Sequence, residues 1–369
     1  MSTADIELSD ADKADRDALV ERMFKSTLEA LELLHVYLGD RLGLYQALAI
    51  GGPLTSRGLA SAAGINERYA REWLEQQAVA GILTVAAGND GDDGRRYGLP
   101  AGHAEVLLDG DSLNFLAPMP RGVVGIAAVM ADVMEAFRTG GGVPYEKYGA
   151  DVRSSISSLN RPMFLNQLGT EWIPAISHVD GRLRTEPPAR VADVGCGTGW
   201  SSIAIARAYP RVKVDGFDLD VASIEDARRN AVGAGVADRV SFEVRNAGDP
   251  KLAGSYDFAT AFETIHDMSD PVGALRAMRG LVKKGGAVLI GDERVAEEFT
   301  APGDELERFM YGWSAVHCLA VGMVGPNSAG TGTVMRPSRL RQYALEAGFG
   351  EIEILPIEHD FWRFYLLSG

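Results

Sequence analysis

The chain has 369 residues, 46% of them apolar and 24% charged, which is the composition of a globular protein with enough apolar residues to bury a sizeable core in two or three domains. Its 36 Lys and Arg residues against 51 Asp and Glu residues leave a net charge of −15, which disfavours nucleic acid or anionic lipid as the main partner. The two cysteines, Cys196 and Cys318, are too few for a disulfide framework or a structural zinc site.

The first 17 residues are acidic and lack both the basic and the apolar segments of a signal peptide. They show no hydrophobic periodicity either, so we expect residues 1–17 to form a disordered tail. No apolar stretch reaches the roughly 20 residues that a membrane span needs. The sequence therefore predicts a cytoplasmic protein that does not contact a membrane.

Residues 18–110 show the pattern of a small, mainly α-helical domain. Apolar residues recur at spacings of three and four from Leu19 to Leu38, and a short helix is expected over residues 44–50. Thr55 and Asn66 are in position to cap two further helices, and residues 82–99 read as a hairpin. Helix, turn, helix and hairpin in this order resemble a winged helix, which we interpret as a dimerisation domain.

DNA binding by this winged helix is disfavoured by charge. Residues 55–83 carry three Arg and three Glu, and residues 1–120 carry 10 basic against 19 acidic side chains. The hairpin tip contains Asp90, Asp92 and Asp93, where a DNA-contacting wing needs the opposite charge. We expect DNA not to be a partner, although a regulator that binds DNA through this domain stays an alternative.

Residues 111–185 are expected to form a helical linker and pocket lid, and residues 186–369 a separate α/β domain. A strand over residues 191–194 leads into a loop containing Gly195, Gly197 and Gly199, which is followed by a helix. A dinucleotide fingerprint would need glycine at position 200, where Trp200 stands. The loop is also preceded by Asp193, whose carboxylate suits the ammonium group of an amino-acid cofactor better than a pyrophosphate. The loop therefore favours S-adenosylmethionine (SAM) over NAD.

The following strands add further candidates for binding this cofactor. Asp218 ends the second strand, 19 residues after Gly199, where a carboxylate can accept both ribose hydroxyls. The remaining candidate cofactor-binding residues lie in the loop or at strand ends: Cys196, Leu219, Asn246, Ala247 and Phe262. The chain closes with an antiparallel hairpin over residues 352–367, which a purely parallel dinucleotide fold lacks. We predict an α/β domain with a Rossmann-like, doubly wound sheet and an antiparallel C-terminal hairpin strand, preceded by the mainly α winged-helix domain.

Over residues 20–369 the sequence resembles the class I SAM-dependent methyltransferases that carry an N-terminal winged-helix domain. The resemblance is carried by residues 193–199, by Asp218 and by the C-terminal hairpin, and it is greatest to small-molecule O-methyltransferases and their bacterial relatives. It implies SAM as cofactor, a small-molecule acceptor and a homodimer formed through the N-terminal helices. Asn246 departs from the Asp that the family often has at this position.

The stretch at residues 264–270 is similar to the His-Asp-Trp-x-Asp motif of these enzymes, in which the histidine is the general base. The resemblance makes His266 the base, with Met268 in place of the tryptophan. It takes the carboxylate that orients the imidazole from the end of the fifth strand, as Asp292 or the adjacent Glu293. The alternative is that His266 only caps the helix that follows.

Acceptor contacts are expected from aromatic and polar residues outside the strands: Trp172, Met310, Trp313 and His317. No metal-binding motif is present, so we expect no metal. An N- or S-methyltransferase acting by proximity alone stays open, and for such an enzyme His266 would be dispensable.

Overall fold

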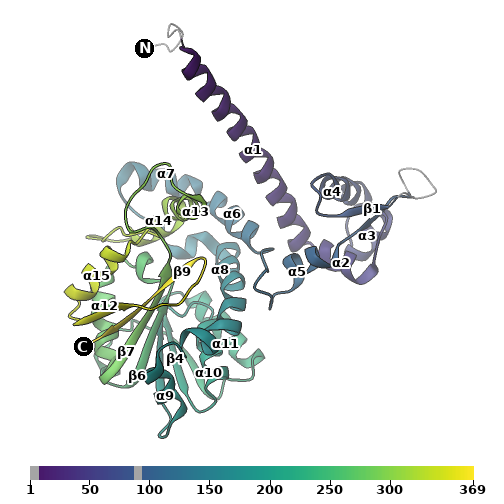
Figure 1. Ribbon diagram of the computed structural model, residues 1–369. Coiled ribbons are helices and arrows are strands. Elements are labelled where there is room, and N and C mark those ends of the chain that lie inside the picture. Colours follow the sequence, from purple (N-terminus) through teal and green to yellow (C-terminus); the bar gives the residue numbers. More distant parts are fainter. Residues whose placement is uncertain (1–7, 87–93) are drawn as a thin grey trace. The chain divides into compact units, whose positions relative to one another are not determined.

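The computed structural model of the chain describes residues 8–86 and 94–369, which divide into two compact units, Met1–Arg121 and Gly122–Gly369 (Figure 1). Each unit buries hydrophobic side chains of its own. The predicted combination of a mainly α N-terminal domain and an α/β domain is confirmed. No helix in the described part of the chain is long and apolar enough to span a membrane.

The first unit consists of one long helix, α1 (Asp10–Arg41), followed by the shorter elements of a winged helix: α2 (Leu44–Gly51), α3 (Ser56–Ala63), α4 (Glu67–Val79), β1 (Thr84–Ala86), β2 (Arg96–Gly98) and α5 (Ala101–Leu108). The predicted caps are present, because Thr55 accepts the Gly58 N–H at 3.1 Å and Asn66 accepts the Arg68 N–H at 2.9 Å. The expected wing tip at residues 90–93 lies outside the described residues.

Helix α1 corrects the predicted tail, because it begins at Asp10 and already includes residues 10–17. Ser9 and Asp12 form a reciprocal capping box, and Lys13 pairs with Asp10 one turn away. These local polar contacts start the helix without an apolar face, which is why hydrophobic periodicity gave no sign of it. Residues 1–7 lie outside the described residues.

The second unit opens with the helices expected between residues 112 and 180. Helix α6 (Met119–Ala128) runs across the boundary between the two units and is followed by α7 (Met130–Thr139). Helix α8 (Gly149–Met163) continues into a π-helical segment, Phe164–Trp172, before α9 (Ser177–Arg184) leads to the sheet.

The second unit is organised around one sheet with the strand order β5-β4-β3-β6-β7-β9-β8. The parallel strands are β3 (Arg190–Val194), β4 (Lys213–Asp218), β5 (Val240–Val244), β6 (Tyr256–Phe262) and β7 (Val282–Glu293). Strand β9 (Trp362–Ser368) inserts antiparallel between β7 and β8 (Glu351–Ile354), as the predicted C-terminal hairpin requires. The strands fan out in the lower part of Figure 1.

Helices connect the strands of this sheet: α10 (Trp200–Ala208), α11 (Val221–Gly233), α12 (Pro271–Leu281) and α15 (Pro337–Glu346). Between β7 and α15 the chain inserts α13 (Glu305–Trp313), a π-helical turn Ser314–Cys318 and α14 (Leu319–Gly322). Neighbouring residues of β3 point into two different hydrophobic clusters, Val191 into one and Ala192 into the other, so the sheet is covered on both faces. The strand order reverses between β3 and β6, where such a sheet forms a crevice at its carboxyl edge.

Candidate functional site

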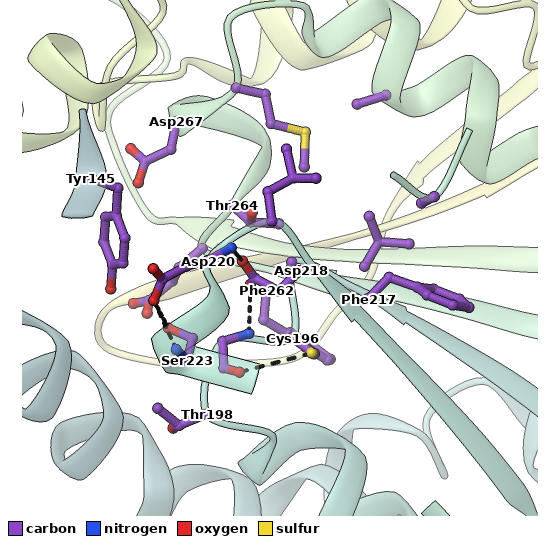
Figure 2. Close-up of a pocket in the computed structure, with 18 of the residues that line it drawn as sticks. Tyr145, Cys196, Thr198, Phe217, Asp218, Asp220, Ser223, Phe262, Thr264 and Asp267 are labelled. Atoms are coloured by element: carbon purple, nitrogen blue, oxygen red, sulfur yellow. Dashed lines mark hydrogen bonds between the residues drawn. The ribbon is translucent and has the colours of Figure 1, made fainter. Parts of the chain in front are cut away.

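A cavity of about 1140 Å³ lies at this carboxyl edge and is called the carboxyl-edge cavity below. It is lined by the glycine loop after β3, by the residues that follow β4, β5 and β6, and by α8. Figure 2 shows Asp218, Asp220 and Asp267 around this cavity, together with Cys196 and Thr198 of the glycine loop. The three carboxylates come from chain segments other than the loop. The cavity is formed entirely by the second unit.

The glycines of the loop are required by its conformation. Gly195 has φ +68° and Gly199 has φ +82°, in the left-handed region that other residues rarely adopt. A Cβ on Gly195 would lie 2.3 Å from Thr264 Oγ1, and one on Gly199 would lie 2.4 Å from Phe242 Cζ. Only glycine at positions 195 and 199 therefore allows the loop to pack against Thr264 and Phe242, and this explains the two glycines of the motif.

Most of the N–H groups of the loop are already used within the chain. Gly195 and Cys196 both donate to the Phe217 carbonyl, at 2.8 and 3.2 Å, and Gly199 donates to the Cys196 carbonyl at 2.9 Å. Gly197 donates to the Asp218 carboxylate at 2.8 Å. A pyrophosphate needs such N–H groups as donors, so the loop fits a ligand without phosphate, as expected for SAM.

Asp218 presents a carboxylate to the carboxyl-edge cavity. Its Oδ2 accepts the Gly197 N–H, and its Oδ1 accepts the Asp220 N–H at 2.9 Å. Burial raises the pKa of Asp218 although these hydrogen bonds oppose the rise. The Leu219 N–H also hydrogen-bonds to this carboxylate. Because a carboxylate has about four acceptor sites, it can still accept from a hydroxyl donor such as a ribose.

The wall beside Asp218 is apolar and suits a flat base. The side chain of Leu219 is 71% exposed and lines the cavity, together with Ala247 and Phe262. Asn246 also lines it, but its Oδ1 accepts the Gly248 N–H at 2.8 Å and shapes its own turn. Asn246 can therefore contact a cofactor through its amide NH2 group, as a hydrogen-bond donor.

Asp193 corrects the predicted ammonium site. Ser201 and Ser202 donate hydroxyl hydrogen bonds to its Oδ2, both at 2.6 Å, and Thr260 donates to its Oδ1 at 2.9 Å. The side chain is 1% exposed and is not among the residues that line the carboxyl-edge cavity. Asp193 therefore ties the start of α10 to β3 and β6, because the hydroxyl-bearing residues around it occupy its oxygens.

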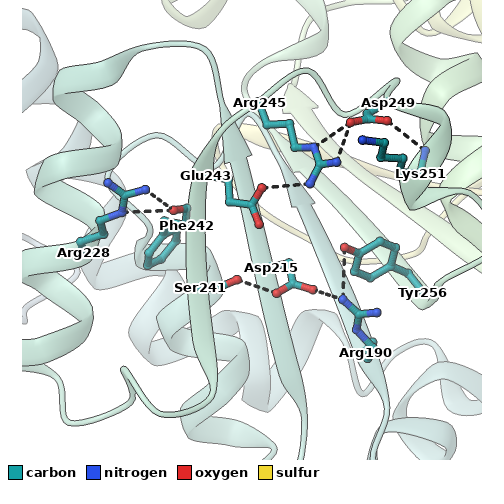
Figure 3. Close-up of polar contacts among 10 residues, drawn as sticks. All are labelled: Arg190, Asp215, Arg228, Ser241, Phe242, Glu243, Arg245, Asp249, Lys251 and Tyr256. Atoms are coloured by element: carbon teal, nitrogen blue, oxygen red, sulfur yellow. Dashed lines mark hydrogen bonds and ion pairs between the residues drawn. The ribbon is translucent and has the colours of Figure 1, made fainter.

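The carboxyl-edge cavity is strongly acidic. Seven carboxylate side chains line it against two guanidinium groups, Arg153 and Arg245. Arg153 pairs with Asp226 at 3.0 Å, and Arg245 pairs with Asp249 and Glu243 (Figure 3). The lining therefore fits a ligand with positive charge, such as the sulfonium of SAM, and it opposes a polyanion.

His266 follows β6 and lies between two carboxylates. Its Nδ1 is 2.7 Å from Asp292 Oδ1 on β7, and its Nε2 is 3.2 Å from Asp267 Oδ1. Burial works to lower the pKa of His266, but Asp292 and Asp267 outweigh it and hold the pKa well above its ordinary range. Of the two predicted orienting carboxylates, the geometry selects Asp292 rather than Glu293.

Asp267, rather than His266, is the member of this group that lines the carboxyl-edge cavity. Its Oδ1 lies 3.2 Å from His266 Nε2, and its charge stabilises the protonated imidazole. Tyr145 reaches the same region from the segment before α8 (Figure 2). Burial and the nearby Asp218 raise the pKa of Tyr145, so it is a neutral phenol that can donate a hydrogen bond.

The structure separates the predicted acceptor residues from the cavity. The prediction for Trp172 is wrong, because its side chain is fully buried in an aromatic cluster with Phe262 and Phe364. Three others lie near α13 without lining the cavity: Met310, Trp313 and His317. His317 packs edge-on against Tyr148, with ring centroids 4.6 Å apart.

Among the lining residues that the sequence did not predict are four with polar side chains close to the proposed chemistry: Tyr145, Asn160, Glu263 and Asp267. Asp267 follows His266 directly in the motif that identified the base, so the motif could have indicated it. The other three lie in segments without a motif: Tyr145 before α8, Asn160 on α8 and Glu263 in the backbone turn after β6.

Comparison with known proteins agrees with this geometry. Residues 186–331 match the family described as methyltransferase domain, and residues 30–108 match the Rv2258c-like winged HTH domain. A ubiquinone biosynthesis O-methyltransferase from Ralstonia nicotianae is 35% identical over 127 residues, which are 34% of this chain and 48% of that protein. The chain thus spans about half the length of this curated relative.

Solved structures share the fold over nearly the whole chain. The mitomycin 7-O-methyltransferase MmcR superposes with a TM-score of 0.69 at 18% identity, covering 97% of this chain and 100% of that one. NcsB1, an O-methyltransferase from neocarzinostatin biosynthesis in complex with S-adenosyl-L-homocysteine (SAH) and 1,4-dihydroxy-2-naphthoic acid, gives a TM-score of 0.60 at 19% identity, covering 92% and 96%. Residues 30–108 thus match a winged helix–turn–helix domain and residues 186–331 a methyltransferase domain, and the solved structures show that the fold of the whole chain is shared with O-methyltransferases.

Proposed function

We propose that this protein is a SAM-dependent O-methyltransferase that methylates a hydroxyl group of a small molecule. The observation that carries the proposal is the buried row Asp292–His266–Asp267, which ends at the carboxyl-edge cavity. The names of similar proteins support it, since one is a ubiquinone biosynthesis O-methyltransferase and another a mitomycin 7-O-methyltransferase. The test is calorimetric titration with SAH followed by a screen of phenolic acceptors for methyl transfer.

The residues of the cavity fit SAM, which supplies an activated methyl group on a sulfonium. Asp218 would accept the ribose hydroxyls, and Leu219 with Ala247 would pack against the adenine. The glycines of the loop have no side chains that would block a ligand lying over them. Methyl transfer then needs an acceptor oxygen held in line with the methyl group and freed of its proton.

The proton is removed at His266 Nε2. Asp292 holds the Nδ1–H and so fixes the tautomer in which Nε2 carries the lone pair. Asp267 lies between Nε2 and the cavity, with its Oδ1 3.2 Å from Nε2. The acceptor hydroxyl reaches Nε2 by taking the place of this carboxylate, and the Tyr145 hydroxyl, which lines the same cavity, can donate a hydrogen bond to the acceptor.

The pH dependence of the reaction follows from this arrangement. His266 acts as a base only when neutral, and Asp292 and Asp267 raise its pKa by stabilising the protonated imidazole. Activity is therefore expected to rise with pH through a midpoint above the ordinary range of a histidine and to be lost as pH falls through that midpoint. Because Asp267 helps to raise the pKa, Asp267→Asn should move this ascending limb to lower pH. The measurement is the pH profile of kcat/KM for both proteins.

The control for this experiment is a second acceptor whose hydroxyl has a lower pKa. If the midpoint of the pH profile changes with the acceptor but not with Asp267→Asn, the titrating group belongs to the substrate and His266 is not the base.

We propose that α1 pairs with a second copy of the chain. Large apolar side chains stay exposed along it at spacings of three and four: Leu19, Val20, Met23, Phe24, Leu28, Leu31, Leu34 and Leu38. Such a stripe on a helix of 32 residues needs a partner to remove it from water. The double variant Phe24→Glu and Leu31→Glu should sediment as a monomer, whereas the parent chain sediments as a dimer. A parent chain that sediments as a monomer would refute the pairing.

We propose that the winged helix does not bind DNA. On α4, Arg68 pairs with Glu72, and Arg71 pairs with Glu67 at 2.8 Å, so neither presents an unpaired charge to a phosphate. A salt-dependent affinity for duplex DNA would contradict this.

We also propose a cytoplasmic location. Both cysteines are buried free thiols, which is the state expected in a reducing compartment. Burial also raises the pKa of Cys318 to about 12, which keeps this thiol unreactive.

A further inference from the structure

Glu263 is a strained residue at the carboxyl end of β6. Its φ is +49°, and Asn327 is the only other non-glycine residue with positive φ in the described part of the chain. A glutamate in the left-handed region costs free energy, and such strain tends to persist where it serves a site. Glu263 lines the carboxyl-edge cavity, so the strained backbone delivers a carboxylate to it.

Two donors fix the side chain of Glu263. The Trp362 indole N–H donates to its Oε1 at 2.7 Å, and the Asn160 amide donates to its Oε2. Trp362 is 1% exposed and packed in the aromatic cluster of β9, so it is a rigid anchor. Each carboxylate oxygen has one acceptor site left, and the half-buried group turns toward the cavity.

The position of Glu263 in the sheet indicates which end of the ligand it meets. Asp218 ends β4, which pairs with β3 on one side of the glycine loop, and β6 pairs with β3 on the other side. Thr264, the next residue, lies directly against Gly195. A ligand with its ribose at Asp218 that crosses the loop therefore carries its far end to Glu263.

The far end of SAM is an amino acid, and its ammonium needs an acceptor. Asp193, the carboxylate expected to provide it, is occupied by three hydroxyl donors and does not line the cavity. Burial raises the pKa of Glu263, and an ammonium ion beside it would restore the ionised form. Neither guanidinium of the cavity competes, because Arg153 and Arg245 are paired elsewhere.

We propose that Glu263 is the acceptor for a protonated primary amine and that this amine is the ammonium group of the methionine moiety of SAM. The proposal rests on the proposed function. Glu263 is thus a positioning residue, since it fixes the amino-acid end of the cofactor and, through it, the direction of the sulfonium methyl. A protonated amine on the acceptor molecule is the other source of the same chemistry.

The test compares two ligands that differ only in the amino-acid part. SAH carries it, whereas 5′-methylthioadenosine has the same adenosine and thioether without it. Both are titrated calorimetrically into the full chain and into Glu263→Gln. Glu225→Gln is the matched control, because Glu225 also lines the cavity and its loss changes the charge equally. The acceptor arm titrates dopamine and 4-methylcatechol into each protein saturated with SAH.

We expect Glu263→Gln to weaken SAH binding by about tenfold to a hundredfold and to leave methylthioadenosine binding unchanged. Glu225→Gln should change the affinity for both ligands by the same small factor. A loss confined to dopamine, with SAH unaffected, would assign the site to an amine on the acceptor and overturn the cofactor assignment. If Glu263→Gln changes neither SAH nor dopamine binding, the amine site is refuted while the proposed function stands. If the parent chain binds neither SAH nor methylthioadenosine, the proposed function itself fails.

Discussion

Replacing His266 with alanine is expected to lower methyl transfer to a hydroxyl acceptor by about 10²- to 10⁴-fold while SAH binds as before. The imidazole is the one basic side chain in the row Asp292–His266–Asp267, and it does not line the cavity in which the cofactor is proposed to bind. Its loss therefore removes proton abstraction without removing a cofactor contact. The measurement is kcat/KM for a responsive acceptor, paired with calorimetric titration of SAH.

The alanine variant leaves the Asp292 carboxylate buried without its partner, which can cost about 3–5 kcal/mol of stability. His266→Gln is the variant that guards against unfolding, since its amide N–H can still donate to Asp292. Asp292→Asn should also lose activity, because an amide no longer enforces the tautomer with the lone pair on Nε2. Full activity in His266→Gln would show that the enzyme works by proximity alone, as an N- or S-methyltransferase can.

The parts of the site that sequence could predict are those fixed by one strand–loop–helix unit. The glycines at positions 195 and 199 and the acid at 218 follow from local steric limits and from the length of one βαβ crossover. His266 and Asp292 came from a family motif, and the parallel pairing of β6 with β7 brings them together. The positions of these residues along the chain were enough to predict that they meet, because adjacent parallel strands end at the same edge of the sheet.

The remaining residues depended on packing that no spacing encodes. Asp193 has the expected position on β3, but three hydroxyl groups from α10 and β6 take its oxygens. Trp172 looked like a contact for an aromatic acceptor, yet the aromatic residues of β6 and β9 bury it completely. Glu263 reaches the cavity through a left-handed backbone turn that a glutamate does not predict.

Replacing Asp218 with alanine is expected to weaken SAH binding by about 10²-fold or more. Two hydrogen bonds from ribose hydroxyls to a carboxylate contribute about 1.5–3 kcal/mol each. The variant also releases the Gly197 N–H, which now donates to Asp218 at 2.8 Å and helps to hold the glycine loop in place. Asp218→Asn should lose less, because its amide oxygen can still accept that N–H. Calorimetric titration of SAH into the three proteins measures this order.

The same titrations with 5′-methylthioadenosine separate the ribose contact from the amino-acid contact. This ligand keeps the ribose, so Asp218→Ala should weaken it by the same factor as SAH, whereas Glu263→Gln should weaken SAH alone. The thermal unfolding midpoint of the ligand-free variant serves as the control, since a large drop would attribute the loss to a collapsed glycine loop. An SAH affinity within threefold of the parent chain in Asp218→Ala would remove this carboxylate from the cofactor site. The expected equal losses for both ligands in Asp218→Ala would show that Asp218 binds the adenosine part, which the two ligands share.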